Sequence, residues 1–256
     1  MNETYAAYLG ELKKIMWRKK YMVFLFIGFF ICILWAIVGS LISGVALNFV
    51  GMPMGHVPTP ISVLPFFAQV LIPLLIFMGA SDLITAETSI IKSTLSRPVA
   101  RYKLYSGKML AITTYVAFYL ACIYVVSAFL NQLLTRATGT GRPLGLLELV
   151  DAFFAYVLTV PPLLVLTLFA GFIALFGRSP SLTMFLLVVL YIIMRVLPIA
   201  FPIFSELLFT SHIGWYRLFV GISPTASRLV HMLLILVGYG AVLFTAGSLI
   251  FDKKEY

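Results

Sequence analysis

The feature that most constrains this chain is a stretch from Tyr21 to Ser81 that contains no Asp, Glu, Lys or Arg. Its one interruption is a segment rich in Gly and Pro, between residues 51 and 60. A helix needs about 20 consecutive apolar residues to cross the hydrocarbon core of a bilayer. The stretch therefore predicts two membrane spans, at residues 21–43 and 62–81, joined by a turn-rich loop.

Four more apolar runs of spanning length follow. They predict spans at residues 109–134, 152–177, 181–204 and 229–251, of which the fifth span overall contains Arg195, Pro198 and Pro202. The chain is 62% hydrophobic and 11% charged, whereas soluble domains are about half apolar and a quarter charged. We therefore predict an all-α integral membrane protein with six transmembrane helices in a single transmembrane domain, residues 1–256.

The basic residues predict the orientation of these spans, because Lys and Arg are retained on the cytoplasmic side of a membrane. Thirteen of them lie in the N-terminal segment, the 82–108 loop, the turn at Arg178 and the C-terminal tail, against four in the alternate loops. Both termini are therefore predicted to be cytoplasmic. The net charge of +9 is explained by this topology and by anionic lipid, so we expect no nucleic-acid partner.

The N-terminal segment, residues 1–20, predicts an amphipathic helix on the inner membrane surface. Tyr5, Leu9, Leu12, Ile15 and Met16 recur at helical spacing, and the charged residues lie mostly elsewhere. A solvated lead-in to the first span is the alternative. The apolar stretch that follows is too long for the hydrophobic region of a cleaved signal peptide.

Motifs for catalysis or cofactor binding are missing from the sequence. It contains no His-Glu-x-x-His and no Gly-x-Ser-x-Gly. Ser106-Gly107-Lys108 matches the end of a phosphate-binding loop, but Tyr102 stands where that loop needs glycine. The two cysteines, Cys32 and Cys122, lie in apolar runs and are too few for a disulfide framework. We expect no enzyme activity and no cofactor in this chain.

The 82–108 loop predicts a short helix that ends at Pro98. Leu83, Glu87, Ile90, Ile91, Thr94 and Leu95 share one helical face. Pro98 disfavours helix at the residue before it and turns the chain back among basic residues. Such a helix suits docking in a groove of another protein; an ordinary helical loop is the alternative.

This loop resembles the first cytoplasmic loop of the permeases of type-2 ABC exporters. The resemblance is carried by Glu87, by Leu95-Ser96-Arg97-Pro98-Val99-Ala100-Arg101 and by Gly107-Lys108. The six spans, the amphipathic N-terminal helix and an apolar outer segment extend it over most of the chain. The sequence departs from the family at Ser89-Ile90, where the family usually has Gly-Thr.

The resemblance implies that the loop is a coupling helix that docks on a separate cytoplasmic ATPase subunit, which holds the ATP and Mg²⁺. The implied contact residues are Glu87, Ile90, Ile91, Leu95, Arg97, Pro98 and Arg101, with Arg178 in a second, smaller contact. The resemblance also implies a second permease copy, identical or similar, and export across the cytoplasmic membrane, which we expect to be that of a bacterium. The cargo stays open: an amphiphilic peptide, a drug or a lipid-like molecule fits.

Arg195 and the outer segment have two interpretations each. A charge within a span usually faces protein or water, so Arg195 either contacts a polar cargo group or is a structural arginine, with Glu206 as a candidate partner. The outer segment contains Leu207, Leu208, Phe209, Trp215, Tyr216, Leu218 and Phe219. It either caps the exit, as the family resemblance implies, or anchors the chain at the interface.

The rival function is an ATP-independent secondary transporter or channel. Ion-coupled carriers commonly place acidic or histidine residues in the middle of the membrane. In this sequence Asp82, Glu148, Asp151 and Glu206 all fall at the ends of predicted spans. That distribution favours the ATP-driven permease over an ion-coupled carrier.

Overall fold

A computed structural model shows that the chain is predominantly helical, as predicted. It describes residues 3–41, 47–49, 52–54, 59–85, 101–138, 143–218 and 226–253. The α-helices are α1 (Glu3–Trp17), α2 (Lys19–Leu41), α3 (Pro60–Phe66), α4 (Ile72–Ala80), α6 (Arg101–Thr138), α7 (Leu146–Ala174), α8 (Pro180–Ala200), α9 (Phe204–Leu207) and α10 (Ala226–Lys253). Two π-helical segments, η1 (Phe67–Leu71) and η2 (Ser81–Thr85), and a 3₁₀ segment, η4 (Phe209–Leu218), complete the helical structure. Strands β1 (Leu47–Phe49) and β2 (Met52–Met54) pair antiparallel.

Six helical stretches of the described residues are long and apolar enough to cross a membrane, which confirms the predicted number. They are Lys19–Val38, Pro60–Thr85, Tyr102–Ala137, Leu146–Ala174, Pro180–Ala200 and Val230–Lys253. The protein is therefore a multi-pass membrane protein. Helix α6 starts well before its predicted apolar run, because basic residues such as Lys103 are good helix formers and a helix can continue beyond the hydrocarbon core.

The second span is a continuous helix built from α3, η1, α4 and η2. It begins at a reciprocal cap: the Ser62 backbone N–H donates to the Thr59 hydroxyl at 3.2 Å, and the Thr59 N–H donates to the Ser62 hydroxyl at 2.9 Å. Pro65 and Pro73 flank η1 and cannot donate to the helical ladder. The wider π turn lies between these two interruptions.

The fifth span ends earlier than the predicted boundary at residue 204. Helix α8 stops at Ala200, and Phe201 adopts extended backbone angles of φ −134° and ψ 97°. Pro202 follows directly, and a proline pushes the residue before it out of the helical region. The boundary is therefore set by local backbone sterics rather than by the end of the apolar run.

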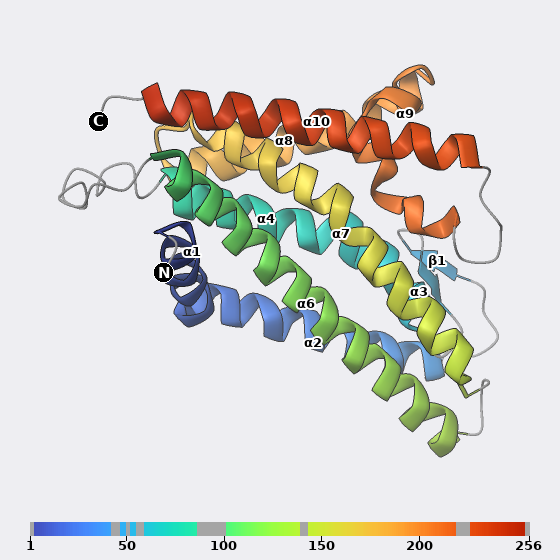
Figure 1. Ribbon diagram of the computed structural model, residues 1–256. Coiled ribbons are helices and arrows are strands. Elements are labelled where there is room, and N and C mark those ends of the chain that lie inside the picture. The colour runs from blue at the N-terminus through green and yellow to red at the C-terminus, as the bar shows by residue number, and fades with distance from the viewer. Residues whose placement is uncertain are drawn as a thin grey trace.

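Helix α1 crosses one end of the bundle, where α2 and α6 begin and α10 ends (Figure 1). The Tyr105 ring of α6 lies 5.6 Å from the Phe251 ring of α10, measured between ring centroids. We call this the terminal end of the bundle. Whether it faces the cytoplasm stays a prediction, as does the position of α1 on the membrane surface.

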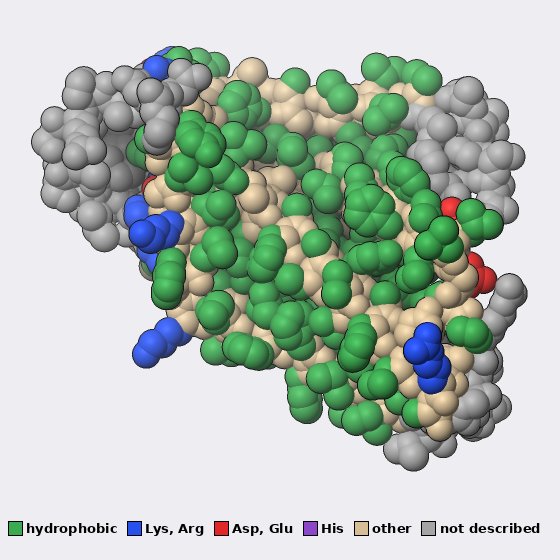
Figure 2. Space-filling model, turned by 60° about the horizontal axis from the view of Figure 1, so that its bottom comes forward, with side chains coloured by type: hydrophobic (Ala, Val, Ile, Leu, Met, Phe, Trp, Pro, Cys, Tyr) green, Lys and Arg blue, Asp and Glu red, His purple; other side chains and the backbone are tan. Residues whose placement is uncertain are grey.

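The second span lies at the centre of the bundle. Ile72, Ile76 and Phe77 are fully buried, and α4 contacts α6, α7 and α8. About half of the described apolar side chains of α8 and α10 are instead exposed on the outside of the bundle, and few are fully buried. Figure 2 shows one face of the molecule, whose middle is apolar, with Lys and Arg side chains at the left and at the lower right and acidic side chains mainly at the right.

Two tyrosines pack into notches formed by glycines. A Cβ atom added at Gly28 would overlap the Tyr119 hydroxyl, and one added at Gly247 would overlap the Tyr105 hydroxyl. Helix α6 can therefore approach both α2 and α10 closely, because small residues let helix backbones come together in membranes. Of the two free cysteines, Cys32 is buried in the core as predicted and Cys122 is partly buried.

Candidate functional sites at the two ends of the bundle

A buried ion pair joins α1 to α6 at the terminal end. The Lys108 ammonium lies 3.0 Å from Glu11 Oε1, and Lys14 lies 3.2 Å from the same oxygen. Lys108 is 1% exposed and Glu11 is 5% exposed. Burying a single charge costs several kcal/mol, so each of these groups requires the other.

The sequence pattern missed this pair, because Glu11 was assigned to the polar side of the N-terminal helix. Helix α1 instead turns Glu11 and Ile15 towards the bundle and leaves Leu9 and Met16 exposed. Gly107 is the signal in the sequence: a Cβ atom there would lie 3.2 Å from the Tyr8 backbone nitrogen. A glycine beside a lysine at the start of a span indicates close approach of another backbone.

Asp82 forms a second polar cluster with the junction between α1 and α2. Its carboxylate accepts a hydrogen bond of 3.0 Å from the Tyr21 hydroxyl and pairs with Lys20, and it lies 3.7 Å from Arg18. Tyr115 of α6 donates to the Tyr21 carbonyl at 2.9 Å. The 6% exposed Asp82 therefore connects the end of the second span to α2 and, through Tyr21, to α6.

Thr85 connects the second span to the turn between α7 and α8. Its hydroxyl donates to the Ala174 carbonyl at 3.0 Å and lies 3.3 Å from the Thr183 hydroxyl. A Cβ atom at Gly177 would overlap the Thr183 hydroxyl, so this turn requires glycine. The structure thus brings the start of the predicted coupling loop beside the turn that carries Arg178.

The predicted ATPase contacts fall mostly outside the described part of the chain. Glu87, Ile90, Ile91, Leu95, Arg97 and Pro98 lie outside the described residues, and Arg101 is the first residue of α6. Arg178 is exposed in the turn that Thr85 contacts. The structure therefore describes the residues on either side of the 86–100 segment, Thr85 and Arg101, and the turn that carries Arg178.

Arg195 lies near the C-terminus of α8, away from the terminal end of the bundle. Two hydrogen-bond acceptors from other elements hold it there. One guanidinium nitrogen donates to the Gln69 side-chain oxygen at 2.7 Å, and the other donates to the Thr210 carbonyl at 3.1 Å. The sequence suggested Glu206 as the partner of Arg195, but the hydrogen bonds of Arg195 go to Gln69 and Thr210 instead. The backbone carbonyl of Glu206 lies 3.1 Å from the His212 ring nitrogen. The structural interpretation of Arg195 thus gains two partners, neither of which the sequence identified.

The outer segment after α8 folds back onto the bundle as α9 and η4. Phe209 packs between Phe169 and Tyr239, with ring centroids 5.7 and 5.4 Å away. Trp215 donates through its indole nitrogen to the Leu158 carbonyl. Burial raises the pKa of Tyr216, while the nearby Arg217 opposes that increase. The η4 part of the segment is therefore packed rather than free, as its apolar composition predicted, whereas α9 buries none of its residues.

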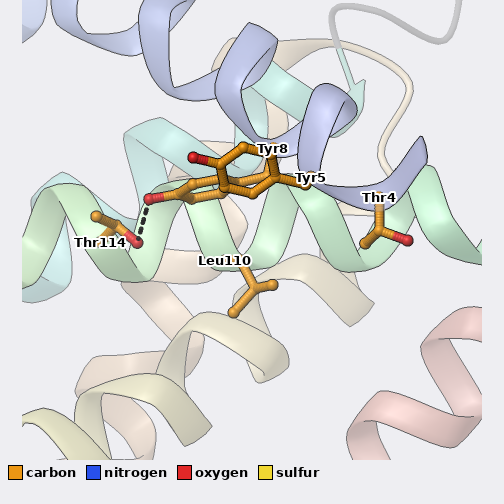
Figure 3. A pocket seen from close by; sticks show the side chains of 5 residues that line it. All are labelled: Thr4, Tyr5, Tyr8, Leu110 and Thr114. Carbon is orange, nitrogen blue, oxygen red and sulfur yellow. Dashed lines mark hydrogen bonds between the residues drawn. The ribbon is translucent and has the colours of Figure 1, made fainter. Parts of the chain in front are cut away.

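Grooves open on the sides of the bundle, among them one between α1 and α6 and one between α6 and α7. The first, of about 420 Å³, lies between α1 and α6 and is lined by Thr4, Tyr5, Tyr8, Leu110 and Thr114. Figure 3 shows the two tyrosines side by side above Leu110, with the Tyr8 hydroxyl donating to Thr114 at 3.2 Å. A second groove, of about 550 Å³, runs between α6 and α7 beside Pro161 and is almost entirely apolar. Both grooves can accept apolar chains but carry no charged group.

Comparison with known proteins adds no relative. The chain matches no protein-family model and no characterised protein. The function therefore has to be argued from the sites described above.

Proposed function

We propose that this protein is the permease subunit of an ATP-driven exporter of the type-2 ABC class. A separate cytoplasmic subunit would hydrolyse ATP, and this chain would supply the membrane path. The observation that carries the proposal is the contact of Thr85 with Ala174 and Thr183. It brings Thr85, which lies within the loop that the sequence resemblance assigns to the ATPase interface, beside the two helices that flank the Arg178 turn.

The polar clusters supply a physical route from such an interface into the bundle. The 86–100 segment is preceded by Asp82, which is bonded to the α1–α2 junction, and followed by Lys108, which is paired with Glu11 of α1. A force on this segment would therefore act on α1, α2 and α6 together. Buried polar contacts suit this role because they have few alternative partners in apolar surroundings.

The transport path would lie between this chain and a second permease copy. Helices α8 and α10 present broad apolar faces to the outside of the bundle, and such faces can meet either lipid or another copy. An apolar interface between copies suits amphiphilic cargo, such as a peptide, a drug or a lipid-like molecule. The same topology would place the protein in the cytoplasmic membrane, with both termini inside the cell.

The alternative function is an ATP-independent carrier or channel. Among the described residues, the acidic side chains lie at the ends of the spans or outside them: Glu3, Glu11, Asp82, Glu148, Asp151, Glu206 and Asp252. Ion coupling commonly uses acidic groups at mid-membrane depth. This distribution favours the ATP-driven function.

Gentle extraction of the tagged protein from its native membrane, followed by mass spectrometry of the co-purified proteins, tests the proposal. We expect a stoichiometric subunit that binds ATP, together with ATP hydrolysis by the purified complex. Recovery of this chain alone, in a form that still transports after reconstitution without ATP, would contradict the proposal and support the carrier.

A further inference from the structure

Several prolines lie within the spans, and three of them, Pro73, Pro162 and Pro198, each remove the helical donor of a carbonyl that another element then reaches. Proline has no N–H, so it cannot donate to the carbonyl four residues earlier. Pro73 leaves the carbonyl of Gln69, Pro162 that of Leu158, and Pro198 that of Met194. In hydrocarbon, a carbonyl without a donor costs several kcal/mol, so each of these positions needs a substitute donor.

Each of the three carbonyls receives a side-chain donor from another element. The Tyr191 hydroxyl of α8 donates to the Gln69 carbonyl at 2.8 Å, and the Thr210 hydroxyl of η4 donates to the Met194 carbonyl at 3.2 Å. Trp215 of η4 donates to the Leu158 carbonyl. The second, fourth and fifth spans are thus each bonded to a neighbour at the carbonyl that a proline leaves free.

Arg195 connects these bonds into one network. Its guanidinium donates to the side-chain oxygen of Gln69 and to the backbone carbonyl of Thr210. The backbone carbonyl of the same Gln69 accepts from Tyr191. Thr210 and Trp215 both belong to η4. The network therefore runs from the second span through α8 to η4 and on to α7.

We propose that η4 is an outer latch, held on the bundle by the bonds of Thr210 and Trp215 to proline-freed carbonyls. Arg195 joins this latch to the Tyr191–Gln69 bond between α8 and the second span. The bonds are strong because the carbonyls have no helical donor to return to. They also depend on the three proline interruptions, so a rearrangement of any one span would weaken the whole network. In the proposed exporter, which this role rests on, release of the latch would open the outer end of the path.

Hydrogen exchange of residues 209–218 in the purified protein tests the latch without requiring an ATPase partner or a cargo. Trp215→Phe removes one indole N–H and keeps a ring, and Thr210→Val removes one hydroxyl at similar size. Loss of one buried partner should accelerate exchange about tenfold across the whole of η4. Tyr124→Phe is the matched control, because Tyr124 donates at 3.0 Å to the Leu149 carbonyl, whose helical donor Phe153 is not a proline.

Restoring the missing backbone donor gives the decisive comparison. In a Pro162→Ala background the Ala N–H can serve the Leu158 carbonyl, so Trp215→Phe should then accelerate exchange less than about threefold. Pro161→Ala is the control, because Pro161 frees the carbonyl of Val157, which Trp215 does not contact. There the effect of Trp215→Phe should stay at about tenfold.

The outcomes separate the latch from the proposed function. Faster exchange along all of 209–218, relieved by Pro162→Ala and not by Pro161→Ala, supports the latch even if no ATPase subunit co-purifies. Exchange that rises only beside the substituted residue, or equal effects in both proline backgrounds, overturns it. If Trp215→Phe fails to fold, Thr210→Val with and without Pro198→Ala gives the same comparison at the Met194 carbonyl.

Discussion

At the scale of single residues, charged and polar groups in this protein are placed by partners distant in the sequence. Lys108 and Glu11 are 97 residues apart, and Arg195 and Gln69 are 126 residues apart. Lys108 and Glu11 are buried, so neither charge is stable there without the other.

We predict that Lys108→Met destabilises the protein by about 3–5 kcal/mol, because it leaves the Glu11 carboxylate buried without its main partner. The double variant Glu11→Gln with Lys108→Met should recover most of that loss, since no charge is then left buried. Thermal unfolding in detergent measures both effects.

Lys14→Met is the matched control for this comparison. Lys14 contacts the same Glu11 oxygen, but its side chain is 49% exposed, so its loss should cost less than about 1 kcal/mol. Equal destabilisation by Lys14→Met and Lys108→Met would show that burial of the pair is not the cause.

At the scale of elements, the sequence predicted which helices form better than it predicted where each helix ends or which side of it faces the bundle. The six spans and the N-terminal helix appear as expected. Helix α8 ends before its predicted boundary because Pro202 acts locally, and α1 turns Glu11 inwards because Lys108 lies opposite. Apolar run length predicts a span, whereas the face of a helix depends on what packs against it.

The 82–108 loop is the predicted element that the proposed function depends on most. We predict that Glu87→Ala or Arg101→Ala uncouples ATP hydrolysis from transport and leaves membrane insertion intact. Lys92→Ala is the control, since Lys92 lies off the predicted apolar face of the loop. Transport and ATP hydrolysis in reconstituted vesicles measure the coupling, and unchanged transport in both variants would remove the loop from the mechanism.

At the scale of the whole molecule, the two ends of the bundle differ in charge and in the elements that they carry. One end carries α1, the two polar clusters and the Arg178 turn, while the other carries α9 and η4. The predicted orientation places the first end inside the cell, because basic residues are retained there.

Two exposed residues, one at each end, test this orientation. Trp17 and Leu146 are both 79% exposed, so Trp17→Cys and Leu146→Cys in a Cys32→Ala, Cys122→Ala background form a matched pair. A membrane-impermeant maleimide added to intact cells should label the Leu146→Cys variant alone. Both variants should label after detergent lysis; labelling of Trp17→Cys in intact cells would reverse the topology.

The sequence by itself determined that this is a six-span helical membrane protein, because crossing a bilayer depends on the local length of apolar runs. It also pointed to the positions of the prolines that interrupt the spans. Only the tertiary structure decided which groups satisfy the carbonyls that those prolines leave free, and which charges are buried in pairs. Those partners lie far apart in the chain, and in apolar surroundings a polar group is satisfied by whichever donor or acceptor the packing brings within reach.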